Sequence, residues 1–298
     1  MRKARKITGV RRVRNAEPIV VRDPGEMQAL ANKIRRQGMS IGFVPTMGYL
    51  HEGHASLIRA AREESDVVVL SIFVNPTQFG PTEDLDKYPR DMERDTRVAR
   101  DAGVDYIFYP EPRAMYPDGF QTYVTVERLT KGYCGVSRPT HFRGVTTICT
   151  KLFNIVLPHK AYFGQKDFQQ AAVIRRMVKD LDMNLEVVVL PTIRESDGLA
   201  MSSRNAYLSP SERAEAVCLI ESIRLAREMV RNGERDVKTL TAAMRAHIES
   251  KPSARVDYVS IADADSLEEL ETITAKGVIL LAVYIGKTRL IDNEILVV

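Results

Sequence analysis

Several features that are common in other proteins are scarce or missing in this chain. The 298 residues include no tryptophan, three cysteines and 7% aromatic residues. Cys134, Cys149 and Cys218 lie far apart, without the close pairs of a zinc site or the density of a disulfide framework. We therefore expect reduced thiols and a cytoplasmic protein. No apolar run approaches the roughly 20 residues that a membrane-spanning helix requires, so we expect no membrane association.

Positive charge is concentrated at the N-terminus. The net charge is +4, yet residues 1–14 contain seven Lys and Arg and no acidic residue, so the remainder carries −3. We expect residues 1–18 to form a basic, mobile extension, and contact with nucleic acid or anionic lipid is the alternative. The missing tryptophan, the lack of a stacking-aromatic array and the acidic body argue against a nucleic-acid-binding protein.

Short apolar runs alternate with helical patterns through the first two thirds of the chain. We expect strands over residues 41–46, 66–74, 104–109, 161–163 and 186–190, and a short β-rich run over 122–126. We expect helices over residues 54–64, 85–102, 146–157 and 168–181. This alternation is typical of the α/β class, and it predicts a Rossmann-like, doubly wound parallel sheet with helices on both faces. Ligands of such sheets bind beyond the carboxyl ends of the strands.

The pattern changes near residue 192. Ser209 and Pro210 are typical of a helix start, and a second helix is expected over residues 237–250. Strands are expected over residues 254–261, 278–285 and 288–297. We therefore predict a nucleotide- and substrate-binding domain over residues 19–192, a smaller C-terminal α+β domain over residues 193–298, and a cleft between them.

The most informative segment joins the strand at residues 41–46 to the helix that follows it. His51 and His54 lie at this junction, together with Gly48 and Gly53. Free backbone N–H groups and the positive end of the helix dipole gather at a helix start and favour phosphate. Glycines allow the backbone to approach a ligand closely, and imidazoles can donate hydrogen bonds to phosphate oxygens. The segment predicts nucleotide chemistry without a covalent protein nucleophile.

This His-x-Gly-His pattern resembles the HIGH signature of class I aminoacyl-tRNA synthetases and related nucleotidyltransferases. Four further blocks follow in order, at residues 71–80, 84–90, 163–170 and 194–205. In type, order and spacing the five blocks resemble the pantothenate synthetase (pantoate–β-alanine ligase) family, from about Ile19 to the C-terminus. Within the last block, Met201-Ser202-Ser203-Arg204 resembles the KMSKS loop, with Arg204 where a lysine often stands.

The resemblance implies an enzyme that condenses (R)-pantoate with β-alanine at the expense of ATP. The products would be pantothenate, AMP and pyrophosphate, formed through a pantoyl-adenylate intermediate on the route to coenzyme A. It also implies a homodimer and Mg²⁺ accompanying ATP. The alternative is another nucleotidyltransferase with the HIGH motif, which would share the histidines but not the pairing of Gln78 with Gln170.

The resemblance also implies which residues line the ATP site. They are Met47, Gly48, Tyr49, Leu50, His51, Glu52, Gly53, His54, Gly164, Gln165, Lys166, Asp167, Ile193, Met201, Ser202, Ser203 and Arg204. We expect His51, His54, Lys166 and Arg204 to act in catalysis by stabilising the phosphates. The family treats the second histidine as a proton donor. We expect His54 to donate a hydrogen bond instead, because pyrophosphate can depart without proton transfer.

Neutral amides are expected to bind the small acids. The resemblance places pantoate against Gln78 and Gln170 and β-alanine near Gln78, since each amide can both donate and accept. Weaker site candidates are Asn75, Arg138 and His141, the last two on an expected loop at residues 138–144. Mg²⁺ is expected to bind largely through phosphates and water. Asp95 is the carboxylate expected near the metal, and an exposed acidic helix face is the alternative.

Overall fold

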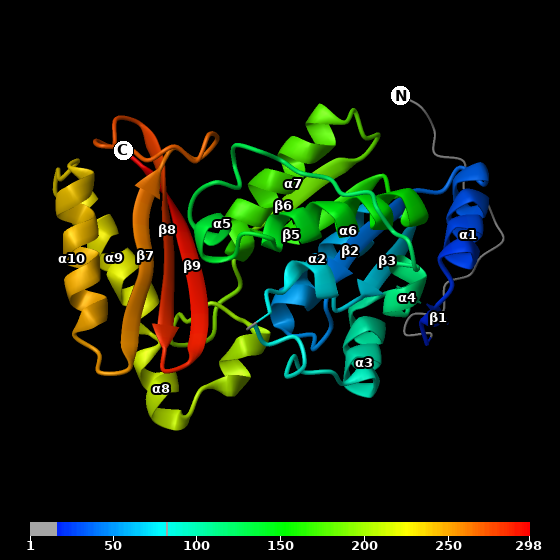
Figure 1. The fold of residues 1–298 in the computed structure, drawn as a ribbon, viewed down its shortest axis with the longest axis horizontal. Helices are drawn as coiled ribbons and strands as arrows, with labels where there is room; N and C mark the ends of the chain where they lie inside the picture. The colour runs from blue at the N-terminus through cyan, green and yellow to red at the C-terminus, as the bar shows by residue number, and fades with distance from the viewer. Residues whose placement is uncertain (1–16, 82) are drawn as a thin grey trace.

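The computed structural model describes residues 17–81 and 83–298. The predicted basic extension at residues 1–18 therefore falls almost entirely outside the described residues. The rest of the chain forms a six-stranded parallel sheet and a three-stranded antiparallel sheet (Figure 1). Within residues 17–81 and 83–298, no helix has the length and apolar character needed to cross a bilayer.

The parallel sheet has the strand order β1-β4-β3-β2-β5-β6. Its strands are β1 (Ile19–Val21), β2 (Ile41–Thr46), β3 (Val67–Ile72), β4 (Tyr106–Phe108), β5 (Lys160–Gly164) and β6 (Glu186–Leu190). From β2 the chain adds β3 and β4 on one side, then returns to add β5 and β6 on the other. The strand order thus reverses between β2 and β5, and the crevice beyond their carboxyl ends is the expected ligand position.

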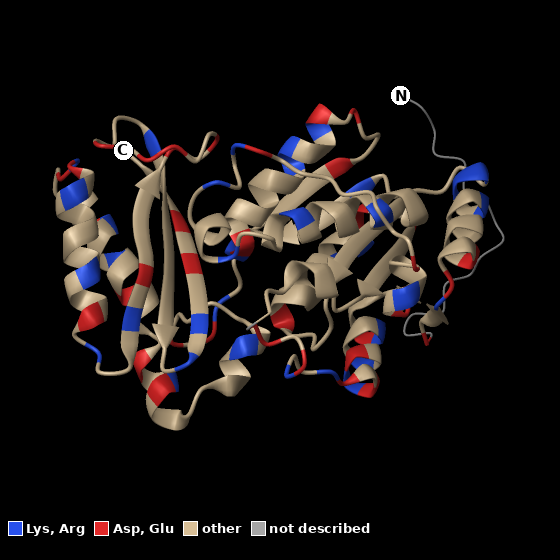
Figure 2. Cartoon of the chain, viewed as in Figure 1, with Lys and Arg blue, Asp and Glu red and all other residues tan. Residues whose placement is uncertain are grey.

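Helices cover both faces of this sheet. One face packs against α1 (Pro24–Arg36), α6 (His141–Val156) and α7 (Phe168–Asp180), and the other against α2 (Glu52–Glu64) and α3 (Met92–Ala102). Successive side chains of a strand point to opposite faces. Accordingly Phe43 enters the first layer and its neighbour Val44 the second. Burial on both sides explains why β2 and β3 carry no charged residue, whereas charges cover the helices and loops (Figure 2).

The C-terminal part consists of three helices and the antiparallel sheet. These are α8 (Pro210–Glu215), α9 (Cys218–Arg231), α10 (Val237–Glu249), β7 (Ala254–Ala262), β8 (Lys276–Ile285) and β9 (Thr288–Val297). Helices α9 and α10 cover one face of this sheet. On the opposite face, Tyr258 and Ile295 belong to an apolar cluster that includes Tyr133 and Phe168, which precede the C-terminal part in the chain. The predicted fold class is confirmed: a Rossmann-like α/β sheet with a smaller C-terminal α+β unit.

Some predicted elements are wrong. The helix predicted over residues 85–102 begins at Met92, because Pro89 lacks a backbone donor and Asp91 caps the helix by accepting from the Arg94 amide at 3.0 Å. The predicted β-rich run at residues 122–126 is not a strand. The amide of Val124 in this run instead donates to Thr147 Oγ1 of α6 at 3.0 Å.

Other elements were missed or begin earlier than predicted. The prediction omitted β1 and α1, although Asp23 followed by Pro24 is a typical helix start, with the Asp23 carboxylate accepting from Glu26 N–H. Helix α6 begins at His141 rather than at residue 146, so most of the expected loop at residues 138–144 is helical. Two short helices, α4 (Pro112–Met115) and α5 (Cys134–Ser137), and three 3₁₀ turns, η1 (Pro76–Gln78), η2 (Gln165–Asp167) and η3 (Ser203–Tyr207), complete the fold.

Candidate active site

The turn between β2 and α2, residues 46–54, is the histidine loop. Gly48 has a φ of 88°, and a Cβ there would lie 2.9 Å from Asp95 Oδ2. The carboxylate of Asp95, from α3, accepts hydrogen bonds from the amides of Tyr49 at 2.8 Å and Leu50 at 2.6 Å. Asp95 is 1% exposed. We conclude that Asp95 ties the histidine loop to α3, and that Gly48 makes the close approach possible.

The two histidines are held by the backbone at the start of α2. Nδ1 of His51 accepts from the Gly53 amide at 3.2 Å, and Nδ1 of His54 accepts from the His51 amide at 3.3 Å. A backbone N–H can only donate, so in each neutral ring the proton sits on Nε2. The ring centroids are 4.1 Å apart. Both rings can therefore offer an Nε2–H donor to the same ligand.

Burial keeps both imidazoles neutral. Loss of solvation, followed by the Lys166 ammonium, lowers the pKa of His51 to about 4. Loss of solvation, followed by the charge of His51, lowers the pKa of His54 well below its usual value. A neutral ring has no extra proton to transfer at neutral pH. The geometry therefore favours hydrogen-bond donation over the proton-donor role.

Lys166 follows β5 and lies in η2, ahead of α7. The Asn293 side chain of β9 donates to the carbonyls of Gln165 and Lys166, both at 2.9 Å, and so fixes this turn from the C-terminal sheet. Within the described part of the chain, the Lys166 ammonium has neither a hydrogen-bond nor an ion-pair partner. A cation near a helix start is favourable only beside an anion. Asp167 does not cap α7 through its side chain.

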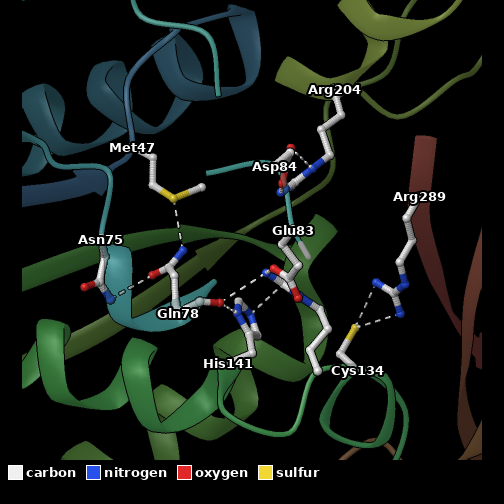
Figure 3. Close-up of polar contacts among 10 residues, drawn as sticks. Met47, Asn75, Gln78, Glu83, Asp84, Cys134, His141, Arg204 and Arg289 are labelled. Atoms are coloured by element: carbon white, nitrogen blue, oxygen red, sulfur yellow. Dashed lines mark hydrogen bonds and ion pairs between the residues drawn. The ribbon is translucent and has the colours of Figure 1, made fainter. Parts of the chain in front are cut away.

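The KMSKS-like segment lies in the arginine loop, residues 201–207. The Arg204 guanidinium forms a bidentate ion pair with Asp84, in which Nε donates to Oδ2 at 3.0 Å and Nη2 donates to Oδ1 at 2.9 Å (Figure 3). The Ser202 hydroxyl accepts from the Arg204 amide at 3.2 Å and orders the turn. The Ser203 hydroxyl contacts the Tyr49 carbonyl at 3.5 Å. The arginine loop therefore packs against the histidine loop, with Arg204 paired to an acidic side chain.

Arg138 and His141 support the backbone of Gln78. The Gln78 carbonyl accepts from His141 Nδ1 at 3.1 Å and from Arg138 Nη2 at 3.3 Å. Arg138 also forms a bidentate ion pair with Glu83, in which Nε donates to Oε1 at 2.8 Å and Nη2 donates to Oε2 at 2.5 Å. Burial, followed by the Arg138 charge, lowers the pKa of His141 to about 3. His141 is therefore neutral, with the Nδ1 proton directed at the backbone.

These segments converge on one cavity of about 230 Å³. Its lining includes the following predicted site residues: Met47, His51, Gly53, His54, Asn75, Gln78, Arg138, His141, Gly164, Lys166, Asp167, Gln170, Ile193, Met201, Ser202, Ser203 and Arg204. Five other predicted ATP-site residues are not part of this lining: Gly48, Tyr49, Leu50, Glu52 and Gln165. A larger cavity of about 770 Å³ is lined by residues between 83 and 170 and between 199 and 293, and it shares Lys166, Gln170 and Arg204, among others, with the first cavity.

The described residues do not form a dedicated metal centre. Across residues 17–81 and 83–298, no group of three or more His, Cys, Asp or Glu side chains is placed to hold a metal ion. Both oxygens of Asp95 already accept from the histidine loop. These contacts favour an anchoring role for Asp95 over the expected role beside Mg²⁺.

The sequence pattern did not single out three residues that contact the site. Glu83 and Asp84 pair with Arg138 and Arg204, and Asn293, which is 2% exposed, holds η2. The pairing partners are separated by 55 and 120 positions. The sequence signal for the two acidic residues was their position, since Asp84 is the first residue of the block at residues 84–90 and Glu83 directly precedes it.

Comparison with known proteins identifies the family of this chain. The profile of the family described as pantoate-beta-alanine ligase matches residues 19–295. The pantothenate synthetase of Syntrophus aciditrophicus is 55% identical over 270 residues, covering 91% of this chain and 94% of the relative. The pantothenate synthetase of Moorella thermoacetica is 57% identical over 262 residues, covering 88% of this chain and 93% of the relative.

Solved structures give the same result. The pantothenate synthetase of Thermus thermophilus aligns with a TM-score of 0.88 at 45% identity, covering 93% of this chain and 98% of that one. A second solved structure is the pantoate-beta-alanine ligase of Francisella tularensis, complexed with beta-gamma ATP and beta-alanine. It aligns with a TM-score of 0.77 at 35% identity, covering 93% of this chain and 97% of that one. The chain described here belongs to the pantoate–β-alanine ligase family.

Proposed function

We propose that this chain is an AMP-forming ligase that joins (R)-pantoate to β-alanine. In the first step the pantoate carboxylate attacks the α-phosphorus of ATP, and pantoyl adenylate and pyrophosphate form. In the second step the β-alanine amine attacks the acyl carbon, AMP leaves with the bonding electrons, and the amine loses a proton to water or phosphate. Family membership across residues 19–295 supports this reaction, as does a homologous ligase complexed with beta-gamma ATP and β-alanine.

The observation that carries the proposal is the set of phosphate-binding groups around one cavity. The Nε2–H groups of His51 and His54 are available as donors, and Lys166 lines the same cavity. Phosphoryl and nucleotidyl transfer depends chiefly on positioning and on stabilising the charge that develops on oxygen. We infer that these groups stabilise the α-phosphate during attack and the departing pyrophosphate.

Arg204 contributes a second cation from the other domain. Its guanidinium is paired with Asp84, so ATP phosphates must share it or displace the carboxylate. The arginine loop contacts the histidine loop through Ser203 and Tyr49. We infer that this contact brings Arg204 to the phosphates and helps to exclude water from the reactive adenylate.

Pantoate is assigned to the end of the cavity near Gln78 and Gln170. Both glutamines line the cavity, and apolar side chains including Phe73, Val145 and Leu152 line it as well. Amides suit the carboxylate and hydroxyls of pantoate, and an apolar wall suits its dimethyl carbon. β-Alanine is assigned to the neighbourhood of Gln78, where its amine can reach the acyl carbon.

The remaining parts of the proposal follow from the family resemblance. Mg²⁺ supplies charge neutralisation when it enters with ATP, bound through phosphate oxygens and water. We also propose a homodimer in the cytoplasm, with the two domains dividing between residues 192 and 193. Among the described residues, no group of His, Cys, Asp or Glu side chains forms a dedicated cage for the metal.

A burst experiment tests the reaction. Purified enzyme mixed with ATP and pantoate alone is expected to release one equivalent of pyrophosphate per active site, and AMP is expected to appear only after β-alanine is added. An enzyme that withholds pyrophosphate until the amine arrives would refute the adenylate intermediate. Consumption of nicotinamide mononucleotide in place of pantoate would instead support the alternative nucleotidyltransferase.

A further inference from the structure

The side chain of Asn75 has only one possible orientation. Asn75 is 1% exposed. Its Oδ1 accepts from the Thr77 backbone N–H at 3.4 Å, and its Nδ2 donates to the Gly144 carbonyl at 3.1 Å. A backbone N–H can only donate and a carbonyl can only accept, so the two ends of the amide cannot be exchanged. In this orientation Oδ1 also accepts from the Tyr116 hydroxyl at 2.9 Å.

The orientation of Asn75 determines that of Gln78. The second Nδ2 proton of Asn75 points to Gln78 Oε1 at 3.2 Å (Figure 3). A donor must face an oxygen, so the Gln78 NH₂ group takes the opposite side. There it contacts the Met47 sulfur at 3.0 Å, at the wall of the cavity. A thioether is a weak acceptor, and a ligand oxygen at that position is the better partner.

The rest of Gln78 cannot move to escape this arrangement. Its carbonyl accepts from His141 and Arg138. The 3₁₀ turn that carries Gln78 also lies directly on α6, where a Cβ at Gly144 would be 2.5 Å from the Thr77 carbonyl. A shift of the turn is therefore blocked on that side. Gln78 itself is 8% exposed.

We propose that Asn75 is a positioning residue that makes Gln78 a one-way hydrogen-bond donor, so that this wall of the cavity selects a carboxylate oxygen and rejects a donor group. The inference rests on the proposed function for the identity of the ligand, the pantoate carboxylate. A glutamine side chain can in general either donate or accept, and the contact with Asn75 restricts Gln78 to donating toward the cavity. Gln170 differs, because no hydrogen bond within the described residues sets its amide.

The test compares binding of pantoate with binding of its carboxamide, in which an NH₂ group replaces one carboxylate oxygen. Dissociation constants are measured by calorimetry in the presence of a non-hydrolysable ATP analogue. The wild-type chain is expected to prefer pantoate strongly. The Asn75→Ala variant frees the Gln78 amide to rotate, and its preference for pantoate is expected to fall by about tenfold or more. Asn32→Ala on α1, outside the cavity lining, is the matched control and is expected to leave the preference unchanged.

A double-mutant cycle shows whether Asn75 acts through Gln78. If it does, Asn75→Ala changes the preference in the wild-type background and adds nothing in a Gln78→Ala background. Independent, multiplying effects of the two substitutions would overturn the inference. Unaltered preference in folded Asn75→Ala would overturn it as well.

An isosteric variant covers the case in which Asn75→Ala does not fold. Asp at position 75 has the shape of Asn but donates to Gln78 only when protonated. Asn75→Asp is therefore expected to bind pantoate more tightly as the pH is lowered from about 8 to about 6, a range in which the ligand stays ionised. A pH-independent affinity equal to that of the wild type would contradict the inference. A wild-type chain that binds no pantoate would instead refute the proposed function, and this inference with it.

Discussion

The carboxylate of Asp84 and the guanidinium of Arg204 form a two-pronged ion pair, with N–O distances of 3.0 and 2.9 Å. The pair joins the loop that precedes α3 to the arginine loop, 120 positions later in the chain. Each side chain is about one quarter exposed. The carboxylate presents two acceptor oxygens to the planar guanidinium, as a phosphate group also can. Asp84 therefore occupies the face of Arg204 that an ATP phosphate is expected to use.

Replacing Asp84 by Asn should tighten ATP binding. The neutral amide no longer competes with phosphate for Arg204, and a partly exposed pair of this kind contributes up to about 1 kcal/mol. We expect a lower dissociation constant for ATP by about two- to fivefold, measured by calorimetry on the enzyme without pantoate. Asp86→Asn removes an exposed carboxylate two positions away and is the control. Equal effects of both variants would point to general electrostatics rather than to the pair.

Replacing His54 separates hydrogen-bond donation from proton transfer. His54→Ala is expected to slow pyrophosphate release by about 10²- to 10³-fold while changing pantoate affinity little, because a donor to the transition state is lost. His54→Gln retains an N–H donor without a titratable group. It should keep part of the rate in single-turnover measurements. Equal losses in both variants would argue for a proton-transfer role.

The buried histidines should make the fold less stable in acid. The pKa of His51 is lowered to about 4 in the folded chain by burial and by Lys166, whereas an unfolded histidine titrates near 6.5. Between these values the unfolded chain binds a proton that the folded chain does not. The contribution to stability is thus complete above about pH 6.5 and is lost as the pH falls toward about 4.

Urea denaturation at a series of pH values measures this effect. The free energy of unfolding of the wild-type chain should fall more steeply between about pH 6.5 and 4 than that of His51→Asn, whose side chain does not titrate there. Asn can also accept the Gly53 amide as a cap. Parallel slopes for the two proteins would show that the His51 imidazole is protonated without cost in the folded state.

Replacing Asp95 distinguishes an anchor from a metal ligand. Asp95→Asn places an NH₂ group against one of two backbone donors of the histidine loop, so we expect the chain to lose about 1–3 kcal/mol of stability. ATP affinity should fall with it, while the Mg²⁺ concentration for half-maximal rate should stay the same. Asp91→Asn alters only the cap of the same helix and is the control. A raised Mg²⁺ requirement would restore the metal-ligand interpretation.

Local patterns predicted much of the fold and the position of the site. The strands β2 and β6 match the predicted residues, because short apolar runs with clear ends have few alternatives. The histidine loop was expected at a strand–helix junction and lies there, since parallel strands place their carboxyl ends at one edge. The start of α3 was missed because a favourable helical pattern continued past Pro89, where the backbone lacks a donor.

The sequence by itself determined the parallel sheet, the edge at which ligands collect, and the residue types gathered there. It did so because burial periodicity and helix-start chemistry are local properties. Only the tertiary structure decided how those residues are oriented and paired. Asn75 meets Gly144 across 69 positions, and Arg204 meets Asp84 across 120. Which end of an amide faces a ligand depends on partners that only folding brings together, and no local pattern encodes them.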